Sequence, residues 1–334
     1  MLRVSNIMMS NNMCNYIQNN LQRSAKSQEQ ISTGKTIIRP SDNPTEISHL
    51  MSVNATLIGN EQYARNIQDG LAYLEQSDSA LDTIGKFFHD AKILALQGAN
   101  GTLTKEDMQA IGEQIDKQID ALVDLGNSSL GGKYLFAGTK NGQPPFERVK
   151  DAGKDIIYYR GNTDLVRREV IFGFDYEVVT PGVTENTSVK SGVFGKLTDA
   201  ADPDYQIDDP MNPGPPAEKM TKITGGPFDV LYELKNYLNN GDSAGVNVCL
   251  GKLDSAHQDI LTHRVGVGAR TRHLEAVKDQ LADQEVKLRG VLVDIQGADI
   301  AKLTVEVAQN QLVHQASLMT ASKLLSTSLL QFLK

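Results

Sequence analysis

The sequence predicts a mainly α-helical fold. Long antiparallel helices form a terminal coiled coil and a helical-bundle core, and a β-rich domain is inserted at the tip. Three observations lead to this prediction. Both ends of the chain carry the 3–4 spacing of a coiled-coil seam. The stretches inward of each end have helical periodicity, and the residues that favour strands gather in the middle of the chain.

Composition narrows the classes of function. The chain has 334 residues, enough for two or three domains, and 40% of them are hydrophobic. Its net charge of -8 argues against nucleic-acid binding, which requires a basic surface. No run of 18 apolar residues occurs, so no membrane span is expected. The N-terminus lacks the apolar core of a cleaved signal peptide.

The first helix is expected in an N-terminal segment that is unusually poor in charge. Residues 5–22 include six asparagines and no charged residue. A surface helix normally has a charged outer face, so this one is poorly suited to exist alone in water. Its predicted seam positions are Ile7, Ser10, Cys14, Ile17, Leu21, Ser24, Gln28 and Ile31.

The C-terminal segment repeats this pattern. From Leu303 to Leu333 the only charged residues are Glu306 and Lys323. We expect the two end helices to pair with each other and then to pack against other copies or partners. The predicted C-terminal seam is Ile300, Thr304, Val307, Gln311, His314, Leu318, Ala321, Leu325, Ser328 and Phe332. The predicted assembly residues on both helices are Ile7, Cys14, Ile17, Leu21, Ile31, Val307, Leu318, Leu325 and Phe332.

Two core helices are expected next. Residues 45–98 have the periodicity of one long amphipathic helix. The segment Thr104 to Asp107, "TKED", is similar to a capping box and predicts the start of a second helix. That helix should end at the Gly-rich turn "GNSSLGG".

The middle of the chain then changes character. Residues 134–193 are rich in β-branched and aromatic residues between turn signals, which predicts strands and hairpins. Residues 199–216 are rich in Pro and Asp and are expected to form an irregular loop. Helical periodicity returns at 228–238 and 246–261, and continues from 267 onward.

The helical phase slips at Gly297–Asp299, opposite the Pro40–Pro44 boundary near the N-terminus. These breaks predict three nested domains. The terminal coiled-coil domain comprises 1–43 and 298–334, the helical core 44–139 and 226–297, and the β-rich outer domain 140–225.

The stretch "STGKTIIRPSDNP", from Ser32 to Pro44, contains the Gly-Lys-Thr that ends a phosphate-binding loop. It lacks the glycine five residues earlier, so we interpret it as a joint between domains. Gly34 is expected to end the first helix in a left-handed cap, and Pro40 to hold the residues before it extended. We expect Ser41 or Asp42 to cap the next helix.

Arg39 and Asp42 are the polar residues of this joint that we expect to set its geometry. The hypothesis is that they fix the angle between the inner and outer layers. They would do so through contacts with the Asp294–Asp299 region or with a neighbouring subunit.

No constellation argues for catalysis. "GDSAG", Gly241 to Gly245, matches the nucleophile elbow of esterases, but a helical segment precedes Ser243 where an elbow needs a strand. The six histidines have no metal-ligand spacing. The two cysteines, Cys14 and Cys249, are too few for a disulfide framework. We therefore expect no catalytic residues, no metal and no cofactor, and keep an esterase using Ser243 as a remote alternative.

Several segments resemble the flagellin superfamily. "ISTGKTIIRPSDNP" resembles the segment that joins the terminal and core domains in flagellins and in hook-filament junction proteins. "GGKYLFAGTKNGQPPF", "YRGN", "RVGVGARTRHLE" and the closing "NQLVHQASLMTASKLLSTSLLQFL" are similar to the FlgL family of junction proteins. Flagellins usually open with Ile-Asn-Thr-Asn and follow the joint with Asp-Asp-Ala-Ala-Gly. Here "LRVSNIMMSNN" and "RPSDNPTEISHL" stand instead and favour FlgL.

This resemblance implies a structural role in the bacterial flagellum. A ring of copies would lie between the hook-associated protein FlgK and the first flagellin subunits. The resemblance also implies export in an unfolded state through the flagellar channel, without a cleaved signal, to an extracellular location. Before export, a chaperone such as FlgN would hold the C-terminal segment. The alternative within the superfamily is a flagellin that polymerises into the filament itself.

Overall fold

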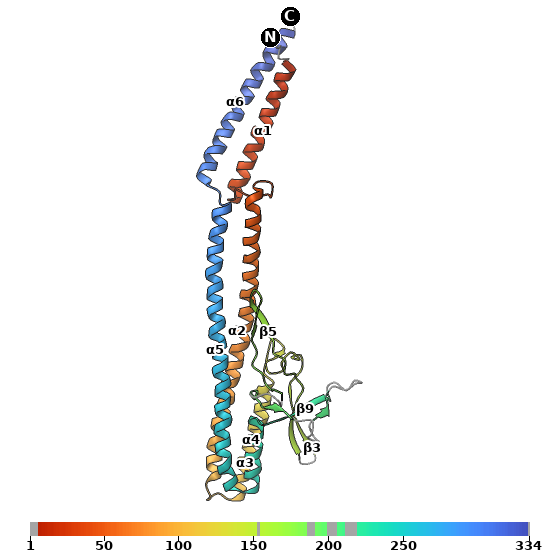
Figure 1. Ribbon diagram of the computed structural model, residues 1–334, viewed down its shortest axis with the longest axis vertical. Helices are drawn as coiled ribbons and strands as arrows, with labels where there is room; N and C mark the ends of the chain where they lie inside the picture. The colour runs from red at the N-terminus through yellow and green to blue at the C-terminus, as the bar shows by residue number, and fades with distance from the viewer. Residues whose placement is uncertain (1–5, 152–153, 186–190, 199–205, 211–218, 333–334) are drawn as a thin grey trace. The chain divides into compact units, whose positions relative to one another are not determined.

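The computed structural model describes residues 6–151, 154–185, 191–198, 206–210 and 219–332. It is mainly helical, with long helices at both ends and small sheets in the middle of the chain (Figure 1). The chain falls into two compact units. The terminal unit comprises residues 1–59 and 282–334, and the central unit comprises residues 60–281. Helices α2 (Pro44–Ala99) and α5 (Ser243–Gln296) contribute residues to both.

The terminal unit is built on two antiparallel helices. Helix α1 (Asn6–Thr33) packs along α6 (Ile300–Phe332), and the N-terminal end of α1 lies beside the C-terminal end of α6 (Figure 1). Both predicted end helices are therefore confirmed, as are the breaks that follow α1 and precede α6. The first turns of α2 and the last turns of α5 complete this unit. Its buried apolar residues include Ile37, Leu50, Val53, Leu57 and Leu303.

Capping residues define where the helices of the central unit begin and end. Helix α3 (Lys105–Gly126) starts with the predicted capping box, in which Thr104 and Asp107 bond to each other's backbone N–H. Helix α4 (Pro227–Asn240) ends at Gly241, which has a left-handed φ of 76°. The long helix predicted over residues 45–98 is confirmed as α2. The stretches predicted from residue 246 onward are one continuous helix, α5.

Nine short strands lie between α3 and α4 among the described residues. A mixed-length antiparallel sheet has the order β3-β4-β9-β7, with β8 also paired to β9, and β5–β6 and β1–β2 form separate pairs. The strands are β1 (Ser129–Leu130), β2 (Lys133–Tyr134), β3 (Phe146–Asp151), β4 (Lys154–Tyr159), β5 (Arg167–Ile171), β6 (Phe174–Glu177), β7 (Lys196–Leu197), β8 (Gln206–Asp208) and β9 (Lys219–Thr224).

The prediction of an irregular loop at residues 199–216 was partly wrong. Strand β8 lies within it and pairs with β9 through Gln206–Thr221 and Ile207–Met220. The polar, Pro-rich sequence does not predict this three-residue strand, because pairing with β9 and not local propensity stabilises the strand. Residues 199–205 and 211–216 of this prediction lie outside the described residues.

The sheet and the helices of the central unit share one hydrophobic cluster. Rings from the strand region and α4 meet in it: Phe146 lies 4.6 Å from Phe194, 5.2 Å from Tyr159 and 6.0 Å from Phe228, measured between ring centroids. The few aromatic residues of the chain thus concentrate where the sheet meets the helices. Each contributes apolar area and tilted ring contacts there.

Arg148 of β3 ties the sheet to two helices by charge. Its side chain is only 6% exposed and pairs with Asp116 and Asp120 of α3 and with Asp155 of β4. Lys235 of α4 also contacts Asp116 and Asp155, at 2.7 and 3.0 Å. Burial by itself raises the pKa of Asp116, but hydrogen bonds from Lys235 and Arg148 outweigh it and hold that pKa well below its usual range.

Removing the guanidinium should leave three carboxylates close together, with Lys235, Lys150 and Lys117 as their remaining lysine contacts. We therefore expect Arg148→Leu to reduce the free energy of unfolding by about 3–5 kcal/mol, as for other broken buried ion pairs. Urea denaturation followed by far-UV circular dichroism measures this. The control is Arg167→Leu, because Arg167 is 61% exposed in its pair with Glu177 and an exposed pair contributes at most about 1 kcal/mol. Equal effects of the two substitutions would contradict a structural role for the cluster.

Candidate assembly surface

The joint after α1 is a short backbone ladder between the two halves of the terminal unit. Gly34 ends α1 with a φ of 68°, and its N–H bonds to Gln30 O at 2.8 Å, which confirms the predicted left-handed cap. Thr36 N then donates to Gln296 O at 2.7 Å, and Ala298 N donates to Gly34 O at 3.0 Å. The start of the joint is thus fixed to the end of α5 by main-chain bonds.

Asp42 closes the joint back onto α1. Its carboxylate accepts the backbone N–H groups of Ile38 and Arg39, at 3.1 and 2.9 Å, and an ion pair from Lys26 at 2.8 Å. The hydrogen bond from Lys26 and the two backbone bonds lower the pKa of Asp42 to about 2. Pro40 lies in the turn between Arg39 and Asp42, where Asp42 N donates to Arg39 O.

The residue that caps α2 was predicted wrongly. Neither Ser41 nor Asp42 does so; Asn43 Oδ1 accepts the N–H groups of Thr45 and Glu46, each at 3.3 Å. Asp42 is unavailable because both of its oxygens already accept bonds from the preceding residues and from Lys26. With Asn43 as the cap, Pro44 takes the first helical position, where its missing N–H is of no consequence.

Arg39 does not contact the Asp294–Asp299 region as hypothesised. Its guanidinium lies 3.3 Å from Glu29 of α1, and both side chains are substantially exposed. The contact with residues 296–298 is made instead by the backbone of residues 34–36. Because exposed pairs contribute little to stability, the main-chain ladder and Asp42 hold the joint.

Half of the side chains along the seam between α1 and α6 are polar. The residues buried or half-buried along it recur at alternating steps of three and four, as in a coiled coil. Ser27 is 5% exposed and Leu303 8%. The seam is Met13, Ile17, Asn20, Ser24, Ser27 and Ile31 in α1, with Leu303, Val307, Asn310, His314, Ser317 and Ala321 in α6.

The predicted seam had the right period, but seven of its thirteen positions whose side chains are described were wrong. Ile17, Ile31 and Val307 lie in the seam, whereas Cys14 is exposed and Leu21 and Leu318 are 50% and 48% exposed. The predicted stripe and the true one differ by one residue at every second position. At four of the six positions that differ the pair uses the smaller side chain, and helix separation depends on the side chains at the contact. These four are Asn20, Ser27, Asn310 and Ser317. Ile7, Leu325 and Phe332 lie in these helices, but their side chains are outside the described part.

Large apolar side chains on the same helices face solvent. On α6, Val305, Leu312 and Met319 recur every seven residues and are 58%, 68% and 69% exposed. On α1, Tyr16 is 63% exposed, alongside Leu21. The three α6 side chains lie on one face of the helix, because residues seven apart are two helical turns apart, and an exposed apolar face of this kind is typical of a protein–protein interface. We name these five residues the outer stripe.

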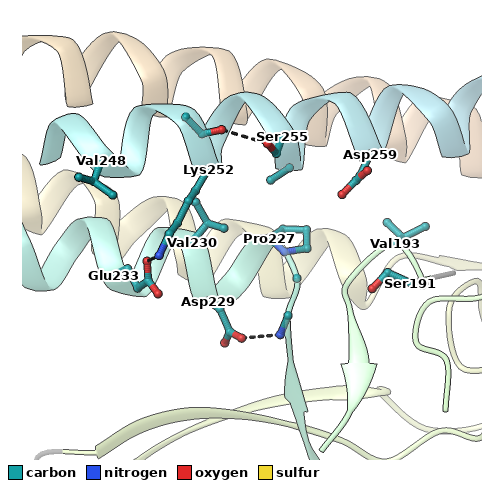
Figure 2. A pocket seen from close by; sticks show the side chains of 15 residues that line it. Ser191, Val193, Pro227, Asp229, Val230, Glu233, Val248, Lys252, Ser255 and Asp259 are labelled. Carbon is teal, nitrogen blue, oxygen red and sulfur yellow. Dashed lines mark hydrogen bonds and ion pairs between the residues drawn. The ribbon is translucent and has the colours of Figure 1, made fainter. Parts of the chain in front are cut away.

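Ser243 lies in a turn between two helices and not in a nucleophile elbow. Gly241 caps α4 and Ser243 begins α5, so a helix stands where the elbow needs a strand. A pocket of about 530 Å³ lies nearby, between α4, α5 and the segment around Val193 (Figure 2). It is lined by Asp229, Glu233 and Lys252 among others, but Ser243 does not contribute to it.

Within the described part of the chain, no cluster of three or more potential metal-binding side chains is found. In the same residues, no helix is both long enough and apolar enough to cross a bilayer.

The pKa of Asp42 makes the joint sensitive to acid. Since folding lowers this pKa from 3.8 to about 2, the stabilisation is present above pH 4 and is lost as the pH falls from about 4 to 2. We expect Asp42→Asn to lower the thermal midpoint at neutral pH, and the difference from the unmodified chain to shrink across that range. Circular dichroism melts at a series of pH values measure this. Asp283→Asn, at an exposed carboxylate of α5, is the control; a pH-independent difference for Asp42→Asn would contradict the assignment.

Comparisons with known proteins match both ends of the chain. The family models of the bacterial flagellin N-terminal and C-terminal helical regions match residues 4–141 and 250–333. Flagellar hook-associated protein 3 of Escherichia coli K12 is 25% identical over 92% of each chain, and that of Salmonella typhimurium LT2 is 23% identical over 99% of each. The fold is similar to a solved structure described as a flagellar hook-associated protein from Vibrio parahaemolyticus, with a TM-score of 0.58 and 18% sequence identity. The match covers 77% of this chain and 100% of that one. The chain therefore belongs to the flagellin superfamily, as a hook-associated protein of the FlgL family.

Proposed function

We propose that this chain is a structural adaptor at the junction between flagellar hook and filament, and that copies of it assemble as a ring through α1 and α6. The observation that carries the proposal is the outer stripe. It places large apolar side chains on the exposed side of helices that have few charges. Burying a leucine of this kind contributes about 1.5–3 kcal/mol, so repeated contacts between copies would sustain an assembly.

The partners follow from the position of such a ring. Hook-associated protein FlgK would lie on its hook side and the first flagellin subunits on its filament side. We propose export in an unfolded state through the flagellar channel to the extracellular flagellum, after a chaperone such as FlgN has held α6. Both cysteines are free, which is compatible with passage as an extended chain.

We propose that the chain has three domains with different roles in the assembly. Residues 1–43 and 298–334 would form the inner, assembling layer, residues 44–139 and 226–297 the helical core, and residues 140–225 the outer domain. Gly34, Arg39, Pro40 and Asp42 would act as the joint between the inner layer and the core. The ladder from residues 34–36 to 296–298 supports this role, because it fixes where one layer ends.

Removing one residue of the outer stripe should weaken assembly without unfolding the chain. We expect Leu312→Ser to leave the helix content of the purified chain unchanged. Losing one leucine contact should lower the association constant between copies by about tenfold or more, equivalent to about 1.4 kcal/mol or more. The readout is the fraction of hooks that carry a filament in the source bacterium with its own copy deleted.

The control for this experiment is Val265→Ser on α5. Val265 is 69% exposed and Leu312 68% exposed, so both changes remove a similarly exposed aliphatic side chain. Normal filament assembly with Leu312→Ser, or an equal defect with Val265→Ser, would contradict the proposed interface.

The second candidate function is that of a filament subunit, because the two matching family models describe flagellin regions. Purified chain added to filament fragments distinguishes the two. An adaptor should add at most a short cap to each fragment, whereas a flagellin should extend it. We expect no extension, measured as filament length by electron microscopy; continuous growth of a homopolymer would favour the flagellin alternative.

A further inference from the structure

The middle of the α1–α6 seam is a polar layer between apolar ends. Ile31 and Leu303 lie near the joint, and Met13 and Ala321 lie toward the chain ends. Between them, α1 supplies Asn20 and Ser24 and α6 supplies Asn310 and His314. We name these four residues the polar layer.

Antiparallel packing brings the four residues to the same level. The Lys35–Gly297 bridge aligns the two helices at the joint. Ser24 lies eleven residues before Lys35 and Asn310 thirteen residues after Gly297. Asn20 and His314 are each four residues further along. Since residues four apart lie on one helix face, the two pairs oppose each other across the seam.

Two atoms of the polar layer are buried without a hydrogen-bond partner among the described residues. They are Asn310 Nδ2 and His314 Nδ1. In separated helices both atoms would bond to water, so closing the seam removes those bonds without replacing them by bonds to protein. The layer therefore opposes the pairing that the apolar ends favour.

Stronger pairing was available to the same helices. The adjacent stripe would bring in Leu21, next to Asn20, and Leu318, next to Ser317, yet these leucines are left 50% and 48% exposed. A polar residue at a coiled-coil core position specifies register at the expense of stability. The seam has the properties of a pairing selected for register and not for strength.

We propose that the polar layer is a conformational device that holds α1 and α6 in register while keeping their pairing weak enough to open. The helices then re-pair, and the outer stripe becomes buried, when copies assemble. This inference rests on the proposed assembly through α1 and α6. It adds a reason why the α1–α6 pair is not too stable to rearrange.

The first test is the stability of the purified full chain. We expect Asn310→Leu/His314→Leu to raise the midpoint of the lowest-temperature transition by at least about 4 °C, because a unit of this size shows shifts of that order for one added favourable interaction. Gln311→Leu/Gln315→Leu is the matched control, since it adds the same side chains one position along, where both glutamines are exposed. If the double variant aggregates, Asn310→Leu alone should still raise the midpoint.

An unchanged or lower midpoint in the layer variants would overturn the proposal. So would an equal rise in the control, because the layer would then have no special effect.

The second test is assembly in the source bacterium. We expect the stabilised double variant to reduce the fraction of hooks that carry a filament several-fold. Normal assembly by a chain with a raised midpoint would overturn the role of the layer as a device. If the unmodified chain is absent from the junction, the proposed function is wrong. The effect of the polar layer on stability would still stand, because the melting experiment does not depend on where the protein acts.

Discussion

The organisation of the terminal unit depends on one short main-chain ladder. Thr36 N bonds to Gln296 O, and Ala298 N bonds to Gly34 O, just where α1 has ended and α6 has not yet begun. Because these bonds use backbone atoms, they fix position along both helices independently of side-chain identity. The register of the whole α1–α6 seam follows from that point. The joint is small, but a shift of one residue there would present different side chains at every level of the pair.

The seam and the outer stripe are two consequences of the same register. With the joint fixed, the facing stripe has Asn, Ser and His in its middle, and Leu21, Leu312 and Leu318 fall outside it. An isolated soluble protein gains stability by burying its large apolar side chains. These helices leave theirs exposed while two buried polar atoms lack partners. Such an arrangement is consistent with a chain whose final partners are other chains, and it explains why the ends carry so little charge.

The central unit is stabilised in a different way. Its core is continuous, and the buried Arg148 cluster links β3 and β4 to α3 and α4. Arg148 has three carboxylate neighbours, two of which also contact Lys235. Such a cluster requires one arrangement of the sheet and helices even where its net contribution to stability is modest. The contrast is physical. The central unit buries one continuous core and a charged cluster, whereas the terminal unit exposes large apolar side chains on helices with few charges, which is a feature of an assembly surface.

The sequence by itself determined the features that arise from local backbone chemistry. Gly34 and Gly241 end helices because they adopt a positive φ readily, Thr104 and Asp107 form a capping box, and the break at Gly297 follows from a visible slip in period. Only the tertiary structure decided which of two adjacent stripes became the seam, because both have the same spacing and each mixes apolar with polar side chains. It also decided that Asn43 caps α2, since Asp42 is engaged by Lys26 and the preceding backbone. The partners of Arg148 and the strand β8 depend on residues distant in sequence, and no local pattern encodes such contacts.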